Sequence, residues 1–209
     1  MSIKEKNEEY KRFAKWANKI GQSVLLLCSS GNLSHRVDEE TLIVSESRKW
    51  LANLKQNHIV KVGLQDGNVI EGNHPTGELP LHLEVFRQNP NVNTVLHCQS
   101  GAATALACRQ SAEINYNVII EVPIYIGNVV HLPFIMPGTK ELANEVAKAS
   151  MHASVIQLSN HGQIIIGTSY KDVYQKAHFF ELACQIIISN NFNCQPITAE
   201  QFEQLKGYR

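Results

Sequence analysis

The chain has 209 residues, 44% of them hydrophobic, and its 19 basic side chains balance its 19 acidic ones. This length and apolar content suit a single packed domain, which we expect to span residues 1–209. A neutral chain without a basic run gives no electrostatic reason to expect a nucleic acid or an anionic membrane as partner.

The first half of the chain alternates helix and strand signals. Residues 10–27 carry apolar side chains at helical spacing and predict a helix. "SSGNLSHR" predicts a turn-rich loop, and "TLIVS" predicts a short strand. The stretch "HIVKVGLQDGNVIEG" predicts a hairpin with Asp66 and Gly67 at or near its tip. "PTGELPLHLEVFRQNP" begins with turn residues and continues as a helix.

The second half continues the alternation. "TVLHCQ" predicts a strand, and "SGAATALACRQ" predicts a helix of small residues behind it. "PGTKELANEVAKAS" predicts a helix opened by a turn, and "ASVIQLSNHGQIIIG" predicts strand, loop and strand. Residues 169–191 predict a long helix, followed by a short tail. Interleaved strands and helices with hairpins among them indicate a layered α/β domain with a mixed sheet.

Two of the nine histidines differ from the rest because each ends an apolar strand, where sites form in α/β sheets. His97 is followed by polar and small residues, and His161 by a glycine that permits close approach. The other histidines, such as His35 and His58, have ordinary interpretations at loop edges. Glu78 follows a Pro-Thr-Gly turn and is a third candidate, although an acid at a helix start is commonplace.

The alternation of side chains along a strand separates Cys98 from its neighbours. His97 and Gln99 face one side, whereas Cys98 faces the other. Cys98 is chemically the better zinc ligand, but it can join His97 only if the strand bulges. We therefore expect Cys98 to be a packed thiol.

Several segments, in this order and spacing, resemble the class II aldolase/adducin family, especially the fuculose-phosphate aldolases. "GNLSHR" resembles the family's Gly-Asn-(Leu/Val/Phe)-Ser-x-Arg loop, and "PTGELPLH" its Pro-Ser-x-Glu-x-x-x-His segment. "VLHCQS" resembles Val-x-His-x-His-(Ser/Ala), and "PGTKELA" is similar to a Gly-Thr-x-Glu-Leu-(Ala/Ser) helix start. "NHG" resembles the His-Gly pair that closes the metal site.

This resemblance implies a three-layer αβα fold with a central, mostly antiparallel sheet, and a homotetramer with active sites between subunits. It also implies Zn²⁺, one per subunit, as a Lewis acid that stabilises the enediolate left by carbon–carbon cleavage. The implied metal ligands are His97, Gln99, His161 and Glu78, and the implied catalytic residues are Glu78, Tyr116 and Tyr208. The implied substrate-binding residues are Asn32, Ser34, Ser45, Ser47, Thr76 and Gly77.

Gln99 departs from the family, because it stands where the middle histidine ligand is expected. A neutral amide oxygen is a poorer zinc donor than imidazole. Three interpretations remain open: Gln99 is a weak fourth ligand or a hydrogen-bond donor to substrate, the site takes Mn²⁺ or Mg²⁺, or the metal is lost as in the adducin branch.

The phosphate loops depart as well. The family's Thr-Pro-(Thr/Ser)-Gly turn is here "VSESRKW", which lacks the glycine. Glu46 adds a negative charge where a phosphate is expected, and Arg48 or Lys49 offers compensation. Thr76 keeps one hydroxyl in the second loop, whereas Gly77 offers only its N–H.

We therefore expect metal-dependent aldol cleavage of a ketose 1-phosphate, like that of fuculose 1-phosphate to dihydroxyacetone phosphate and an aldehyde. Alternatives are a sugar-phosphate epimerase, a methylthioribulose-phosphate dehydratase, or a metal-free adducin-like assembly or binding module. The charged N-terminus lacks the apolar core of a secretory signal, and the five cysteines form no C-x-x-C pair. Both features favour a cytoplasmic protein with reduced thiols and no membrane span.

Overall fold

An eight-stranded sheet forms the centre of the computed structural model, which describes residues 3–109, 114–206 and 208. Its strand order is β4-β3-β2-β1-β5-β8-β7-β6. Each neighbouring pair is antiparallel except β6 and β7, which run parallel. The predicted mixed, mostly antiparallel sheet is confirmed. The strands are β1 (Asn32–Arg36), β2 (Thr41–Ser45), β3 (Ile59–Gly63), β4 (Val69–Glu71), β5 (Thr94–Cys98), β6 (Val129–Leu132), β7 (Val155–Leu158) and β8 (Gly162–Gly167).

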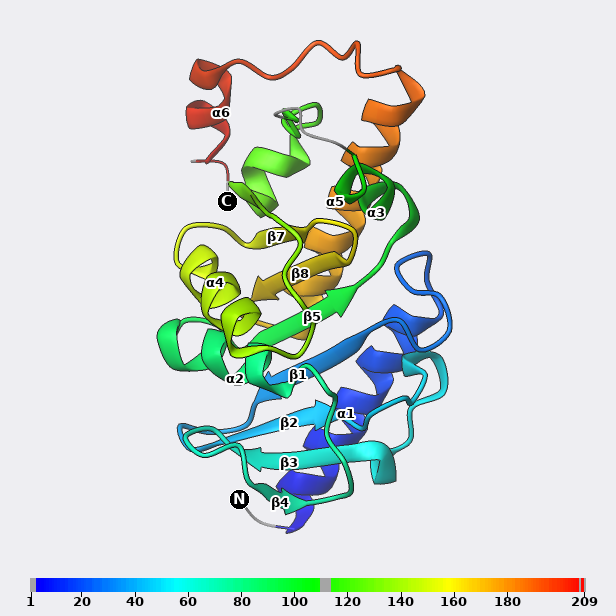
Figure 1. The fold of residues 1–209 in the computed structure, drawn as a ribbon, viewed down its shortest axis with the longest axis vertical. Helices are drawn as coiled ribbons and strands as arrows, with labels where there is room; N and C mark the ends of the chain where they lie inside the picture. The colour runs from blue at the N-terminus through cyan, green and yellow to red at the C-terminus, as the bar shows by residue number, and fades with distance from the viewer. Residues whose placement is uncertain (1–2, 110–113, 207, 209) are drawn as a thin grey trace.

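Helices cover both faces of the sheet, which confirms the three-layer arrangement (Figure 1). Helices α1 (Ile3–Gly21), α3 (Gly101–Ala107) and α5 (Tyr170–Ser189) pack on one face, where Phe13 and Phe180 join Leu33 and Leu96 in one apolar core. Helices α2 (Leu79–Gln88) and α4 (Lys140–Ser150) pack on the other face and bury a second core. The chain also forms the short helical turns η1 (Leu51–Asn53), η2 (Gln56–His58) and η3 (Val122–Ile126), and helix α6 (Ala199–Lys206).

Helix α1 starts earlier and ends earlier than the sequence predicts. The apolar spacing is real, because Tyr10, Phe13, Ala17 and Ile20 are all buried. The helix ends at Gly21, where an added Cβ would lie 2.1 Å from the backbone nitrogen of Ala52. The continuation of the helix to residue 27 was therefore wrong, because close contact with the η1 turn requires the glycine. Val24 and Leu27, which lie within the predicted helix of residues 10–27, are exposed.

Strand β1 corrects a second prediction, because the segment 29–36 was expected to be a loop. Residues Asn32–Arg36 instead form an inner strand between β2 and β5. Leu33 and His35 face the α1 and α5 side, while Asn32 and Ser34 face α2. The polar side chains of Asn32 and Ser34 break the apolar pattern by which a buried strand is recognised in a sequence. His82 of α2 is their hydrogen-bond partner.

Strand β6, turn η3 and helix α6 were not predicted from the sequence, which assigned only a short tail to the C-terminus. The hairpin of β3 and β4 is confirmed, with Gly67 at a φ of +72° near its tip. All five cysteines are free thiols. Among the described residues, no helix combines the length and apolar character that a membrane crossing needs.

Candidate metal centre

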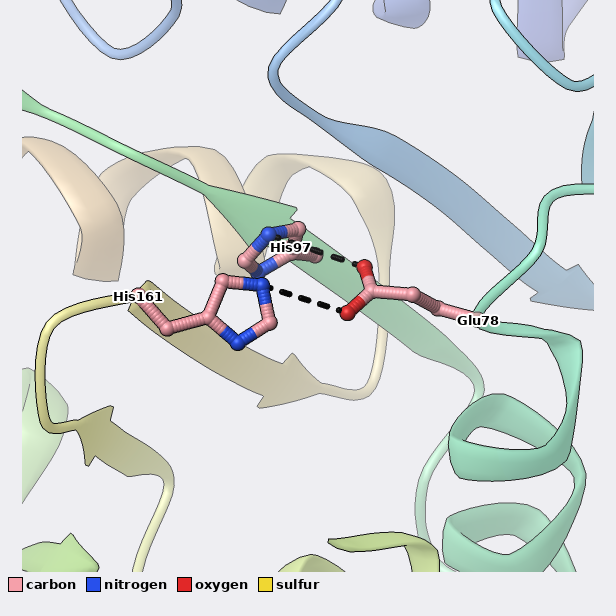
Figure 2. A group of neighbouring side chains, drawn as sticks. All are labelled: Glu78, His97 and His161. Atoms are coloured by element: carbon pink, nitrogen blue, oxygen red, sulfur yellow. Dashed lines mark ion pairs between the residues drawn. The ribbon is translucent and has the colours of Figure 1, made fainter. Parts of the chain in front are cut away.

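Glu78, His97 and His161 converge at one end of the sheet from three separate elements (Figure 2). His97 lies at the end of β5, His161 lies in the turn between β7 and β8, and Glu78 immediately precedes α2. His97 Nε2 lies 3.6 Å from Glu78 Oε2, and His161 Nε2 lies 3.4 Å from Glu78 Oε1. One possible ligand atom from each residue lies within 4.8 Å of the other two.

Local backbone geometry brings the two histidines together. Strands β5 and β8 pair His97 with Ile164, so the turn before β8 lies beside the end of β5. Asn160 adopts a φ of +56°, a left-handed conformation that asparagine tolerates in tight turns. At Gly162, an added Cβ would lie 2.6 Å from the carbonyl oxygen of Cys98, so the glycine permits this approach.

The protonation of the site favours cation binding. His97 Nδ1 donates to the backbone carbonyl of Gln163 at 3.1 Å, so Nε2 is the ring nitrogen that faces Glu78. Burial alone would raise the pKa of Glu78, but His97, the hydrogen bond from Asn32, and His161 together lower it below its usual value. Burial and the neighbouring His97 lower the pKa of His161. Together these shifts favour an ionised carboxylate beside a neutral His161.

The donor set fits a divalent metal ion. Two imidazole nitrogens and one carboxylate oxygen are the three protein ligands of many catalytic zinc sites, which keep a further position open. Glu78 Oε1 is buried and makes no hydrogen bond within the described part of the chain, as expected of an atom that serves as a metal ligand. Glu78, His97 and His161 therefore form a potential metal site.

Gln99 lies on the same side of the strand end as His97, and Cys98 lies on the opposite side, as the alternation of side chains along a strand predicts. An added Cβ at Gly162 would lie 2.8 Å from Gln99 Cγ and 3.1 Å from His97 Cε1, so both side chains contact one small region. Gln99 as a metal ligand stays a prediction. Cys98 is 1% exposed with its Sγ 3.9 Å from Gln163 Oε1, and burial raises the pKa of its thiol to about 12. The expectation of a packed thiol is confirmed.

A buried histidine that was not assigned a role from the sequence is connected to Glu78 through two hydrogen bonds. His82 on α2 is fully buried, with Nδ1 2.5 Å from Ser34 Oγ and Nε2 2.5 Å from Asn32 Oδ1. Asn32 Nδ2 in turn donates to Glu78 Oε2 at 2.8 Å. His82 ends the "PTGELPLH" segment, four residues after Glu78. This helical spacing directs both side chains to the same side at the start of α2. That spacing was the available signal.

Of the other predicted substrate-binding residues, Ser45 ends β2, and Ser47, Thr76 and Gly77 lie in two connected loops. Ser45 is buried, its Oγ accepts from the N–H of Leu33, and its carbonyl accepts from the N–H of Thr76. Thr76 Oγ1 accepts from the N–H of Glu78, and the N–H of Ser47 donates to the carbonyl of His74. Gly77 is exposed, with space around it. These bonds connect the two loops beside Glu78, while substrate binding by these residues stays a prediction.

The first of these loops carries the charges that depart from the family pattern. Lys49 Nζ lies 3.9 Å from Glu46 Oε1, so Lys49 offsets the acidic charge. Arg48 is exposed and has a φ of +61°, the left-handed region that glycine favours. Within the described part of the chain, Arg48 makes no hydrogen bond or ion pair.

Among the described residues, no contact brings the two predicted catalytic tyrosines to Glu78, His97 or His161. Tyr116 is 7% exposed, its ring lies 5.0 Å from that of Phe180, and burial raises the pKa of its phenol. Tyr208 is 80% exposed in the C-terminal tail, away from a packed core. Their catalytic roles stay predictions.

Fold and site together define an α/β protein with a candidate metal centre at a strand end. Residues 11–188 match the family model described as Class II Aldolase and Adducin N-terminal domain, and the chain belongs to this family. A 3-oxo-tetronate 4-phosphate decarboxylase of Escherichia coli (strain K12) is 30% identical, over 86% of each chain. An L-fuculose phosphate aldolase of Methanocaldococcus jannaschii is 29% identical, over 86% of this chain and 96% of the relative. The structure of YgbL from Escherichia coli superposes with a TM-score of 0.90 at 25% identity, over 96% of this chain and 99% of that one. The resemblance inferred from the sequence is confirmed.

Proposed function

We propose that the protein is a metal-dependent carbon–carbon lyase acting on a small phosphorylated keto compound. The observation that carries the proposal is the Glu78, His97 and His161 set, which offers three metal ligands, one of them a carboxylate that can accept and return a proton. Both named relatives cleave a carbon–carbon bond, one by decarboxylation and one by aldol cleavage. Zinc is the ion that this donor set suits best, with Mn²⁺ or Mg²⁺ as alternatives.

The position of each site residue suggests a separate role in metal binding, proton transfer or substrate binding. His97, His161 and, before the substrate binds, Glu78 would hold the ion, which when bound supplies a Lewis acid for the negative charge that cleavage leaves on the substrate. Once the substrate replaces Glu78 on the ion, Glu78 would move a proton to or from the reacting carbon through Oε1, since Asn32 occupies Oε2. Asn32 has a second N–H on its amide, which is available for a substrate oxygen.

Arg48 is the cation best suited to the acidic group of the substrate. Its guanidinium forms no ion pair within the described part of the chain, whereas Lys49 is already paired with Glu46. A non-glycine residue with left-handed φ costs free energy, and such costs concentrate at functional sites. We therefore assign Arg48 to the phosphate or carboxylate of the substrate.

Decarboxylation of a 3-oxo acid 4-phosphate is the reaction we favour. It releases CO₂, and the remaining three-carbon fragment takes one proton at carbon, which the Glu78 carboxylate first accepts from solvent and then delivers. Aldol cleavage also needs a group that takes the hydroxyl proton of the departing aldehyde. Tyr116, expected in that role, lies in the core beside Phe180. Aldol cleavage is the second candidate, supported by the exposed Tyr208, which is free to serve a neighbouring subunit.

A substrate panel with the zinc-loaded protein tests the proposal. We expect 3-oxo-tetronate 4-phosphate to release CO₂ and dihydroxyacetone phosphate in equal amounts, and Glu78→Gln to lower turnover by about 10²–10⁴-fold, the usual contribution of a proton-transfer group. Aldehyde release from a ketose 1-phosphate, without CO₂ from the 3-oxo acid, would favour the aldolase. Glu78→Gln turnover within a few-fold of wild type would refute the assigned role.

A further inference from the structure

A continuous chain of hydrogen bonds runs from the metal centre into the interior beneath α2. It passes from Glu78 Oε2 to Asn32, from Asn32 to His82, and from His82 to Ser34. Asn32, Ser34 and His82 are all buried, so solvent does not replace these bonds. These hydrogen bonds join two residues of β1 to Glu78, which precedes α2, and to His82 within α2.

Donor and acceptor rules fix the direction of every bond in this chain. An ionised carboxylate only accepts, so the Asn32 amide must present its Nδ2 to Glu78 and its Oδ1 to His82. An amide oxygen also only accepts, so His82 must carry a proton on Nε2. Its Nδ1 then accepts from the hydroxyl of Ser34. One tautomer of His82 therefore sets the orientation of the amide.

We propose that His82 is a positioning residue, which acts through Asn32 to hold Glu78 with Oε2 engaged and Oε1 directed at His161. The carboxylate is anchored on one oxygen by Asn32, while Oε1 lies 3.4 Å from His161 Nε2 and makes no hydrogen bond in the described structure. Without the donor on His82, the amide is free to turn, and Glu78 loses its fixed orientation. The link to metal binding rests on the proposed function.

A matched pair of substitutions separates positioning from packing. His82→Gln places an amide N–H near the position of the imidazole Nε2 and retains the bond to Asn32. His82→Met has a side chain of similar length but no donor. If His82 only fills space, the two variants should behave alike. The readout is Zn²⁺ affinity of the full-length chain, measured by competition with a chelator and without any substrate.

We expect His82→Met to bind Zn²⁺ about 10–100-fold more weakly than wild type, the usual effect of losing a residue that orients a ligand. His82→Gln should stay within about threefold of wild type, because the donor to Asn32 is kept. In an Asn32→Ala background, adding His82→Met should change the affinity little, because the connection to Glu78 is already cut. Equal loss in the Gln and Met variants, or an undiminished effect of His82→Met without Asn32, would overturn the proposal.

A second readout does not depend on metal or on the reaction. Two-bond ¹⁵N–¹H NMR of the histidine rings reports which nitrogen of His82 carries the proton. We expect the Nε2–H tautomer at neutral pH, and finding the proton on Nδ1 would overturn the proposal. If the wild-type protein bound none of Zn²⁺, Mn²⁺ and Mg²⁺, the proposed function would fail, and the tautomer would still test the hydrogen-bond direction assigned to His82.

Discussion

Gln99 contacts the same small region as His97, beside the turn that carries His161. Replacing a neutral oxygen donor with imidazole should strengthen zinc binding, because nitrogen is the preferred donor. We therefore predict that Gln99→His holds Zn²⁺ more tightly than wild type in competition with a chelator at one pH. An unchanged affinity would mean that Gln99 does not face the ion.

The neighbouring thiol provides the control for this experiment. Cys98 faces the opposite core and contacts Gln163, so Cys98→Ser should leave the zinc affinity unchanged. Loss of metal in Cys98→Ser would instead show that the thiol had replaced the missing histidine ligand.

His35 makes the folded state sensitive to acid. Burial, with the nearby Arg12, lowers the pKa of His35 to about 4, even though the carboxylate of Glu9 lies 3.7 Å from its Nε2. Thr94 bonds its Nδ1, and the ring of Tyr170 stacks on it at 4.2 Å. The folded state therefore keeps His35 neutral, while the unfolded chain takes up a proton below the ordinary pKa of about 6.5.

The free energy of unfolding should accordingly fall as the pH drops from about 6.5 towards 4. We predict that His35 accounts for about 2 kcal/mol of the loss between pH 7.5 and pH 5. Urea unfolding at both pH values should show a smaller difference for His35→Gln than for wild type. The exposed His152→Gln should keep the full difference, and an equal change in both variants would contradict the assignment.

Single residues also mark where sequence reasoning succeeds and where it stops. His97, His161 and Glu78 were predicted because each stands at a strand end or helix start, and the structure brings them together. The role of His82 was missed because a histidine on an apolar helix face gives no sign of its partners. Its importance depends on Asn32, 50 residues away in the chain.

At the scale of elements, the β7–β8 turn determines the geometry of the metal centre. An added Cβ at Gly162 would lie 2.6 Å from the Cys98 carbonyl oxygen and 3.1 Å from His97 Cε1. We predict that Gly162→Ala destabilises the protein by about 1–3 kcal/mol, a typical cost of forcing extra atoms into a packed region. The same variant should weaken zinc binding, because the turn and the end of β5 must separate.

Gly77→Ala is the matched control for stability, since nothing lies within 4 Å of an added Cβ there. Its midpoint in urea should stay close to that of wild type. Similar losses of stability in both glycine variants would show that close packing at Gly162 is not the cause.

Elements with regular apolar spacing were predicted well, whereas elements with polar or small faces were not. The spacing of Phe13, Ala17 and Ile20 identified α1, but its end depends on contact with η1. Strand β1 was missed because Asn32, Ser34 and His35 are polar residues whose partners come from other elements. Such tertiary partners are not visible in a local sequence window.

For the whole molecule, we predict a closed homotetramer with active sites between subunits. Tyr208 is 80% exposed, and Val24, Leu27 and Trp50 are also exposed, so apolar surface is available for association. Light scattering at micromolar concentration should give four times the mass of the chain. A monomer mass would remove the assembly and the role of Tyr208 across an interface. The cytoplasmic location also stays a prediction.

The central claim is that Glu78, His97 and His161 hold one catalytic metal ion. The most direct test is calorimetric titration of metal-stripped protein with Zn²⁺, for wild type and for His161→Ala. We predict one ion per chain for wild type and loss of most of the affinity in the variant, because one of only three described ligands is removed. Unchanged affinity in His161→Ala would contradict the assigned ligands, and absence of binding of Zn²⁺, Mn²⁺ and Mg²⁺ by wild type would favour a metal-free, adducin-like role.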